Sequence, residues 1–467
     1  MEVSSQATGQ IDRRTSILVA AFILVLALWM LRPVTPLQLA LFIVVVLFLF
    51  GLKKPVFAMA AFLVSLLTAN DYILSGIGIS LRVLLVLLIA VVVWMAFGLR
   101  GVKLGPSAKI IITLALIFVV IGIVANMINT GWSWTFKDLR QSGAGLLIIV
   151  LIPAVTRNLR DLKILCGVFF IGIAASATVA IMQHYNILGM TTHTLIPGYT
   201  NTDNRMPGMA QDPLDLAFVL LSAIPVVLCM YLAKGVQRSS RWLLLIAVIL
   251  MALGTYFTYT RSAIIAVALG TVVLIPFLAK NLRVKLLLTL LIVGVLVIML
   301  GQAHDTRLVS TQDTSAQDRK LLDQAGYDII RDHPLLGIGA YKFPQVSLQY
   351  ASAVDPSVMQ QVGEDLGTLQ PHNDFVYVAA CYGIPALIAF LGLIAAVFVS
   401  LRNSYLTTRR NFIKGLSAGL IGALVAYLVN AYYHNALISI PIVWVLIGFS
   451  LAIAKLSMAE KKARQEL

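Results

Sequence analysis

The chain has 467 residues, of which 60% are hydrophobic and only 12% are charged, and its formal net charge is +15. Soluble domains carry about twice that share of charged residues, so the composition excludes a soluble protein and predicts an integral membrane protein. The three cysteines, Cys166, Cys229 and Cys381, all lie inside apolar runs, where we expect buried thiols and no disulfide framework.

Apolar runs long enough to cross a bilayer as helices recur along the chain. The first, at about 15–31, follows Arg13 and Arg14 and precedes no small-residue cleavage site, which favours a retained helix over a signal peptide. The later runs lie at about 37–52, 55–70, 81–99, 108–128, 142–156, 162–185, 213–233, 242–259, 262–279, 285–301, 373–400, 412–430 and 436–454. We therefore expect an all-α, polytopic protein in which about 12–14 transmembrane helices form a single membrane domain over residues 1–467.

The distribution of charge predicts the orientation, because cytoplasmic loops hold most Lys and Arg residues. With the N-terminus in the cytoplasm, the inner segments hold 24 of the 35 basic residues, and the outer segments hold 15 of the 20 acidic ones. This assignment also places the C-terminus in the cytoplasm. The positive net charge is thus a topology signal, and a nucleic-acid partner is not needed to explain it.

Two expected outer connections carry arginines. Arg140 lies in "KDLRQSG", and Arg205 is the only basic residue of a longer segment at about 186–212. In that segment Asp212 precedes Pro213, which is typical of a helix N-terminus and indicates a structural role for Asp212. The pattern alone leaves the two arginines open to either a structural or a phosphate-binding role.

Arg261 is the only charged residue between Arg241 and Lys280. Both flanks are cytoplasmic by charge, so two helices must be joined by an outward turn with Arg261 at its tip. A lone arginine there could simply extend to the lipid headgroups. Its neighbours favour a second interpretation, in which the planar guanidinium binds phosphate oxygens at a hydrogen-bonding rim. The rim consists of Tyr256, Thr258, Tyr259 and Thr260.

The largest outer segment, about 302–372, is expected to be a large periplasmic loop that contains amphipathic helices. Within "DRKLLDQAGYDIIRDHPLLGIGAYKFP", apolar residues recur at helical spacing at Leu321, Leu322, Ala325 and Ile329. Such a helix could lie on the membrane surface or pack on the end of the bundle, and the pattern fits both. We expect it to end at Pro334 and the following Gly-x-Gly.

His372 stands in "PHNDFVYVAACYGIP", immediately before an apolar run. It could belong to the first turn of a helix, or its imidazole could act as a general base near neutral pH. Neither a Ser-His-Asp order nor metal-ligand spacing accompanies it, so we expect no metal and no cofactor. A base together with phosphate-binding arginines, all facing outward, indicates transfer from a phosphate-activated lipid donor.

The segments "TYTRSA", "RDHPLLGIGAYKF" and "PHNDFVYVAACYGIP", in this order and spacing, resemble the O-antigen ligase and O-antigen polymerase superfamily of bacterial envelope enzymes. "NRMPGMAQDPLDLA" resembles the stretch before that family's central helices, where the family often has Asn at the position of Asp215. The resemblance covers roughly residues 195–395, and the remainder of the chain is similar only in hydropathy.

The resemblance implies a metal-independent, inverting glycosyltransferase in the bacterial inner membrane, with its active site facing the periplasm. Its partners would be a glycan donor on undecaprenyl pyrophosphate and a glycolipid or glycan acceptor. By position, His372 matches the family's catalytic histidine, Arg261 its essential arginine, and Arg205 a second pyrophosphate-contacting arginine. We add Tyr259 and Arg140 to the expected substrate-binding residues.

Several functions remain open at this stage. A ligase would transfer the glycan to lipid A-core or a similar hydroxyl, a polymerase of O-antigen or exopolysaccharide would transfer it to another glycan, and a third variant would glycosylate protein. A polysaccharide-lipid transporter is the alternative outside the enzymes. The sequence disfavours it, because charges gather at the membrane interfaces and the two halves show no internal repeat.

Overall fold

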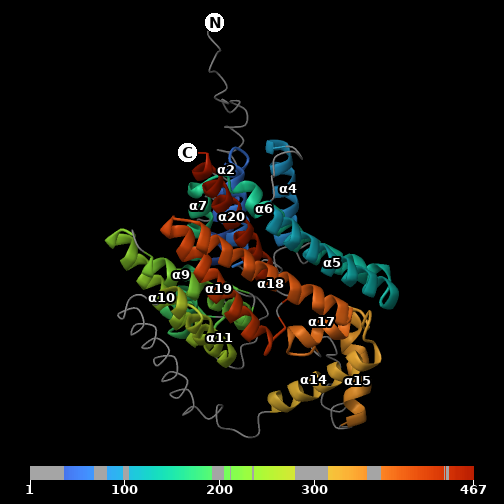
Figure 1. Ribbon diagram of the computed structural model, residues 1–467. Coiled ribbons are helices and arrows are strands. Elements are labelled where there is room, and N and C mark those ends of the chain that lie inside the picture. The colour runs from blue at the N-terminus through green and yellow to red at the C-terminus, as the bar shows by residue number, and fades with distance from the viewer. Residues whose placement is uncertain are drawn as a thin grey trace, which may run out of the picture.

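The computed structural model describes residues 36–67, 81–97, 105–191, 205–210, 212–233, 236–278, 314–354, 370–435, 437 and 441–466. The helices predicted at about 15–31 and 285–301 lie outside these residues. All regular structure in the described part is helical (Figure 1). Its first half comprises α2 (Pro36–Gly51), α3 (Pro55–Ser65), α4 (Leu81–Phe97), α5 (Pro106–Asn129), α6 (Trp132–Val155), α7 (Leu159–His184), η3 (Ile187–Gly189) and α9 (Pro213–Leu232). Its second half comprises α10 (Arg238–Phe257), α11 (Arg261–Val272), α12 (Ile275–Leu278), α14 (Thr314–Asp332), η4 (Ala340–Lys342), α15 (Phe343–Val354), α17 (Asp374–Tyr382), α18 (Ile384–Thr407), α19 (Asn411–Ala431) and α20 (Ile442–Gln465).

Eight of the described helices are long and apolar enough to cross a membrane: α5, α6, α7, α9, α10, α18, α19 and α20. Four shorter apolar stretches belong to α2, α3, α4 and the region from α11 into α12. The chain is therefore an all-α, multi-pass membrane protein, as the hydropathy predicts. The exposed side of α10, with Trp242, Leu243, Ile246 and Ile249, is apolar and suited to contact lipid.

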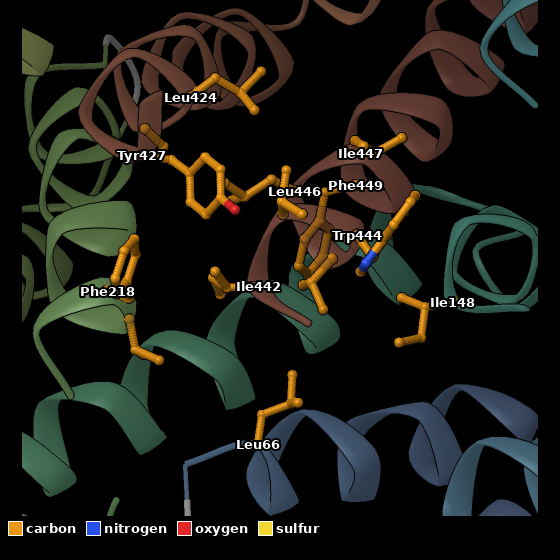
Figure 2. Close-up of a cluster of buried hydrophobic side chains, with 14 of the residues drawn as sticks. Leu66, Ile148, Phe218, Leu424, Tyr427, Ile442, Trp444, Leu446, Ile447 and Phe449 are labelled. Atoms are coloured by element: carbon orange, nitrogen blue, oxygen red, sulfur yellow. The ribbon is translucent and has the colours of Figure 1, made fainter. Parts of the chain in front are cut away.

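The centre of the bundle is formed by α9, α19 and α20, which bury most of their length. Figure 2 shows Phe218 of α9, Tyr427 of α19 and Phe449 of α20 converging there, together with side chains from α6. The helices approach closely where side chains are small: a Cβ on Gly145 of α6 would lie 2.8 Å from the Trp444 ring. Such small-to-large packing substitutes for the hydrophobic effect that lipid does not provide between helices.

The span predicted at 142–156 begins ten residues too late. The helix α6 starts at Trp132, so "KDLRQSG" and Arg140 lie on a helix and not on an outer loop. A hydropathy pattern places this polar stretch outside the membrane. In the structure, the Asp138 carboxylate is buried and accepts hydrogen bonds from Asn126 and Tyr382, which allows the helix to continue through it.

The span predicted at 373–400 is two helices, α17 and α18, which meet at Gly383. Gly383 has φ 91°, and a Cβ there would lie 2.2 Å from the Leu335 carbonyl oxygen. Both the left-handed backbone and the close approach require glycine. The backbone at Leu335 and Leu336 thus lies against Gly383, where the apolar run is divided into α17 and α18.

The two ends of the bundle differ in composition. At one end Lys455 Nζ donates to the carbonyls of Pro153 and Thr156, and Arg464 donates to that of Thr407. The opposite end carries α14, α15 and the start of α17 (Figure 1). The described residues of the segment predicted at 302–372 therefore cap the end of the bundle opposite this basic cluster.

The predicted amphipathic helix of that segment is α14, which ends at Asp332, just before Pro334. Its apolar face is directed at protein: Leu322, Ala325 and Ile329 are buried, and the helix packs against α15 and α17. Of the two interpretations left open by the sequence, the structure favours packing on the bundle over lying on the membrane.

Membrane orientation can be measured by cysteine labelling, because Gln324 on α14 and Ser239 on α10 are both exposed. We expect a membrane-impermeant thiol reagent to label Gln324→Cys in spheroplasts and to label Ser239→Cys only after the membrane is permeabilised. The native cysteines are buried and provide a low background. The reverse pattern would invert the topology and place the large outer segment in the cytoplasm.

Candidate active site

Arg205 is attached to the turn that joins α10 and α11. Its Nε donates to the Thr258 carbonyl at 3.0 Å, and its Nη2 donates to Thr260 Oγ1 at 3.1 Å. The next residue continues the contact, since the Met206 N–H donates to the Phe257 carbonyl. Both threonines are buried, so the guanidinium is held by acceptors that water does not replace.

Arg261 is the first residue of α11, directly after this turn, and it is exposed. Within the turn, Tyr259 adopts φ 51°, a left-handed conformation that is uncommon for a residue other than glycine. The buried Ser262 hydroxyl has no hydrogen-bond partner among the described residues. Two arginines and the N-terminus of a helix therefore meet at one turn, and such a helix end favours anions.

His372 lies just before α17 and is half-buried. The helix is capped by its neighbour, since Asn373 Oδ1 accepts from the N–H groups of Phe375 and Val376. The next residue, Asp374, is buried and accepts hydrogen bonds from the Tyr427 hydroxyl and the Leu437 N–H. Rigid contacts thus fix the backbone that carries His372, while its imidazole does not cap the helix.

The turn between α19 and α20 faces His372. The rings of His372 and His434 lie nearly perpendicular, with centroids 6.1 Å apart. His434 is buried and also meets the edge of Phe218 from α9. Beside it, Asn435 Nδ2 donates to Gln370 Oε1 at 3.1 Å. Segment 370–374 therefore contacts His434, Asn435 and Leu437.

The packing of α11 on α19 brings the arginine turn to the level of the histidines. A Cβ on Gly270 would lie 2.5 Å from the Gly422 carbonyl oxygen and 2.9 Å from the Ala426 Cβ, and a Cβ on Gly422 would touch Leu274, so the two helices are antiparallel. From this crossing, α11 back to Arg261 and α19 forward to its end each extend about 13 Å, at about 1.5 Å per residue. Arg261 and His434 thus lie at the same end of the bundle and at similar depth.

The outer segment 334–340 runs beside the C-terminal half of α17. The N–H groups of Ile338 and Gly339 donate to the carbonyls of Ala380 and Cys381 at 3.0 and 2.9 Å. A Cβ on Gly337 would lie 2.4 Å from the Ala380 carbonyl oxygen, so the two backbones touch. This close approach explains why the motif "HPLLGIGAYKF" has glycine at position 337.

Comparison with protein families identifies the region that carries these residues. Residues 246–391 match the family model described as O-antigen ligase. This part of the chain is similar to the O-antigen ligase family. This match confirms the resemblance to the O-antigen ligase and polymerase superfamily and supports that general type of enzyme. No curated protein matches the chain.

The O-antigen ligase region begins within α10 and ends within α18, so it contains Arg261, the outer segment and His372. Arg205 and His434 lie outside the matched residues. The structure nevertheless connects both of them to it, through the hydrogen bonds of Arg205 to Thr258 and Thr260 and through the ring contact of His434 with His372.

The predicted site residues are not all in one place. Arg205, Tyr259 and Arg261 share the α10–α11 turn, whereas Arg140 lies on α6. Its neighbour is Tyr341 of the outer segment, whose pKa is raised by burial and by Asp138 and is lowered in part by Arg140. Arg140 therefore lies apart from the α10–α11 turn, beside η4.

Sequence reasoning did not identify His434. The signal that could have identified it is the short stretch "AYYHN" between the last two predicted spans. This stretch contains one histidine, His434, and no Lys, Arg, Asp or Glu. A histidine in a predicted outer connection could have been selected on that basis. Its proximity to His372 depends on the packing of α19 against α17 and could not be inferred from the spacing.

Proposed function

We propose that the protein is a glycosyltransferase of the O-antigen ligase type, which moves a glycan from an undecaprenyl-pyrophosphate donor to a hydroxyl of lipid A-core or a similar acceptor. The reaction takes place on the periplasmic face of the inner membrane. One observation carries the proposal: the turn held by Arg205 leads into Arg261 and lies at the same level as the His372 and His434 pair.

The arginine turn suits the donor's pyrophosphate. When the sugar–phosphate bond breaks, negative charge develops on the leaving oxygens, and fixed guanidinium groups stabilise it without reorganising. Arg261 can engage two oxygens at once and stands at a helix N-terminus that also favours anions. Arg205 fixes the shape of the turn and adds positive charge to it.

His372 suits the acceptor. Its imidazole accepts the proton of the acceptor hydroxyl while that oxygen forms a bond to the anomeric carbon. The bond from this carbon to the phosphate oxygen breaks on the opposite face, and undecaprenyl pyrophosphate leaves with the electron pair. A single displacement of this kind inverts the anomeric configuration.

The acceptor is tested by analysing glycolipids from cells that lack the protein. For a ligase, we expect undecaprenyl-linked polymer to accumulate without attachment to lipid A-core, and complementation to restore the attached form. Accumulation of single repeat units would instead identify a polymerase. Movement of lipid-linked glycan across vesicles without any acceptor would contradict both and indicate a transporter.

A further inference from the structure

Asp138 is a buried carboxylate outside the proposed reaction site. It lies on α6 and is 4% exposed. Its Oδ2 accepts from Asn126 Nδ2 of α5 at 2.7 Å, and its Oδ1 accepts from the Tyr382 hydroxyl of α17 at 3.1 Å and from the Ser142 hydroxyl at 3.4 Å. One side chain thus connects three helices, including the helix that follows His372.

The hydrogen bonds of Asn126 allow only one orientation of its amide. The Ala340 N–H can only donate, so it requires the amide oxygen, and the two are 2.8 Å apart. The amide nitrogen must then face Asp138, where it needs an acceptor. The Oδ2 atom of Asp138 supplies that acceptor and thereby keeps the Asn126 oxygen directed at Ala340.

This amide holds the outer segment in register. Asn126 binds the N–H of Ala340, and Asn129, one turn along α5, donates to the Gly337 carbonyl at 3.2 Å. Between these two points the segment donates its own N–H groups to Ala380 and Cys381 of α17. A change at Asp138 would therefore reach the segment and α17 through both Asn126 and Tyr382.

The geometry around Asp138 does not fit direct contact with a sugar. The cavity beside Asp138, lined by Gln141, Ser142 and Trp444 among others, has a volume of about 20 Å³, which holds a water molecule and not a sugar ring. The carboxylate oxygens are directed at protein donors from three helices.

We propose that Asp138 is a positioning residue, which fixes the amide of Asn126 and so sets the register of segment 337–340 against α17. Its effect on glycan transfer rests on the proposed function, because it acts through the helix whose first turn follows His372. Its effect on the docking of segment 337–340 is independent of the proposed function.

A reciprocal exchange separates this role from a chemical one. In Asp138→Asn, the new amide can present its oxygen to Asn126 Nδ2 and donate its nitrogen to the Tyr382 and Ser142 hydroxyls, so a positioning role predicts little change, whereas a chemical role of the carboxylate predicts loss of transfer. In Asn126→Asp, two carboxylates face each other. In the double variant Asn126→Asp with Asp138→Asn, residue 126 supplies acceptors to both Ala340 and residue 138, so every hydrogen bond of the pair can form again.

The readout is the native thiol of Cys381, which is fully buried and whose Sγ lies 3.9 Å from the Ala340 carbonyl oxygen. A thiol reagent reaches Cys381 only when the segment opens. In the purified full-length protein, we expect Asn126→Asp to speed the labelling of Cys381 by about 10- to 100-fold, as loss of a buried hydrogen bond would do, and Asp138→Asn to leave it slow. Labelling of Cys166 and Cys229, which are buried elsewhere, should not change.

We expect the double variant to recover slow labelling and most of the glycan transfer lost in Asn126→Asp. The matched control is Asp161→Asn, which removes a capping carboxylate of α7 at the other end of the bundle and should leave Cys381 protected. The positioning role is wrong if the double variant labels as fast as Asn126→Asp, if it does not fold, or if it regains protection but not the transfer that wild-type performs. If neither wild-type nor variants transfer glycan while protection is lost and regained as expected, the docking role stands and the proposed function fails.

Discussion

Replacement of His372 by alanine is expected to lower glycan transfer by about 10²–10⁴-fold, the usual contribution of a general base. The fold should be retained, because the hydrogen bonds of Asn373 and Asp374 cap α17 and tie it to α19 and are not made by the imidazole. The measurement is product formation from purified lipid-linked donor and acceptor, with donor binding followed separately. Donor binding should remain near normal, since the imidazole acts on the acceptor proton.

Two comparisons make the result specific. His333→Ala changes an exposed histidine just after α14 and should transfer glycan normally. Asn373→Ala removes the helix cap and should cost about 1 kcal/mol of stability, so it shows what a structural loss at this position looks like. Near-normal transfer by His372→Ala would leave His372 as no more than the residue that precedes the cap.

Arg261 gives the second large effect. Arg261→Ala should reduce turnover by about 10²–10³-fold, as removal of a group that stabilises developing negative charge does. Arg261→Lys should also lose a substantial part of the activity, because lysine keeps the charge but cannot engage two phosphate oxygens as a planar fork. The assay is the same transfer reaction, with abundance and folding of each variant checked.

A residue that only extends to the headgroups would behave differently, since lysine reaches them as well as arginine does. Wild-type turnover in Arg261→Lys would therefore remove the phosphate role. Arg241→Lys, an exposed change at the other end of α10, is the control. Arg205→Lys should follow Arg261→Lys with a smaller loss, because lysine cannot bind both Thr258 and Thr260 and the turn loosens.

Features that depend on local sequence were predictable. The break between two apolar runs placed Arg261 at a turn, and it is the first residue of α11. Asp212 ahead of a proline predicted a helix cap, and its Oδ1 accepts from the Leu214 N–H at 2.6 Å. Both follow from the few residues on either side, with no need to know which helices are neighbours.

Features that depend on tertiary partners were not predictable. The helix α6 was predicted too short because Asp138 looks like a loop residue until Asn126 and Tyr382 are brought to it. His434 was missed because its ring meets His372 only when α17 and the end of α19 are adjacent. In a membrane protein, hydropathy locates the helices, and the polar contacts between them decide where they begin and which residues form a site.

The extended backbone at 338–339 also completes the end of α17. A helix leaves its last carbonyl groups without internal partners, and in an environment with little water each must find a donor. Ile338 and Gly339 supply donors to Ala380 and Cys381, while the Ile384 N–H donates back to Pro334. If this stretch lifted away, it would strand carbonyls in an apolar surrounding at a cost of about 1–3 kcal/mol each. This stretch is therefore fixed on α17, and in the proposed reaction a lipid-linked glycan would have to bind without displacing it.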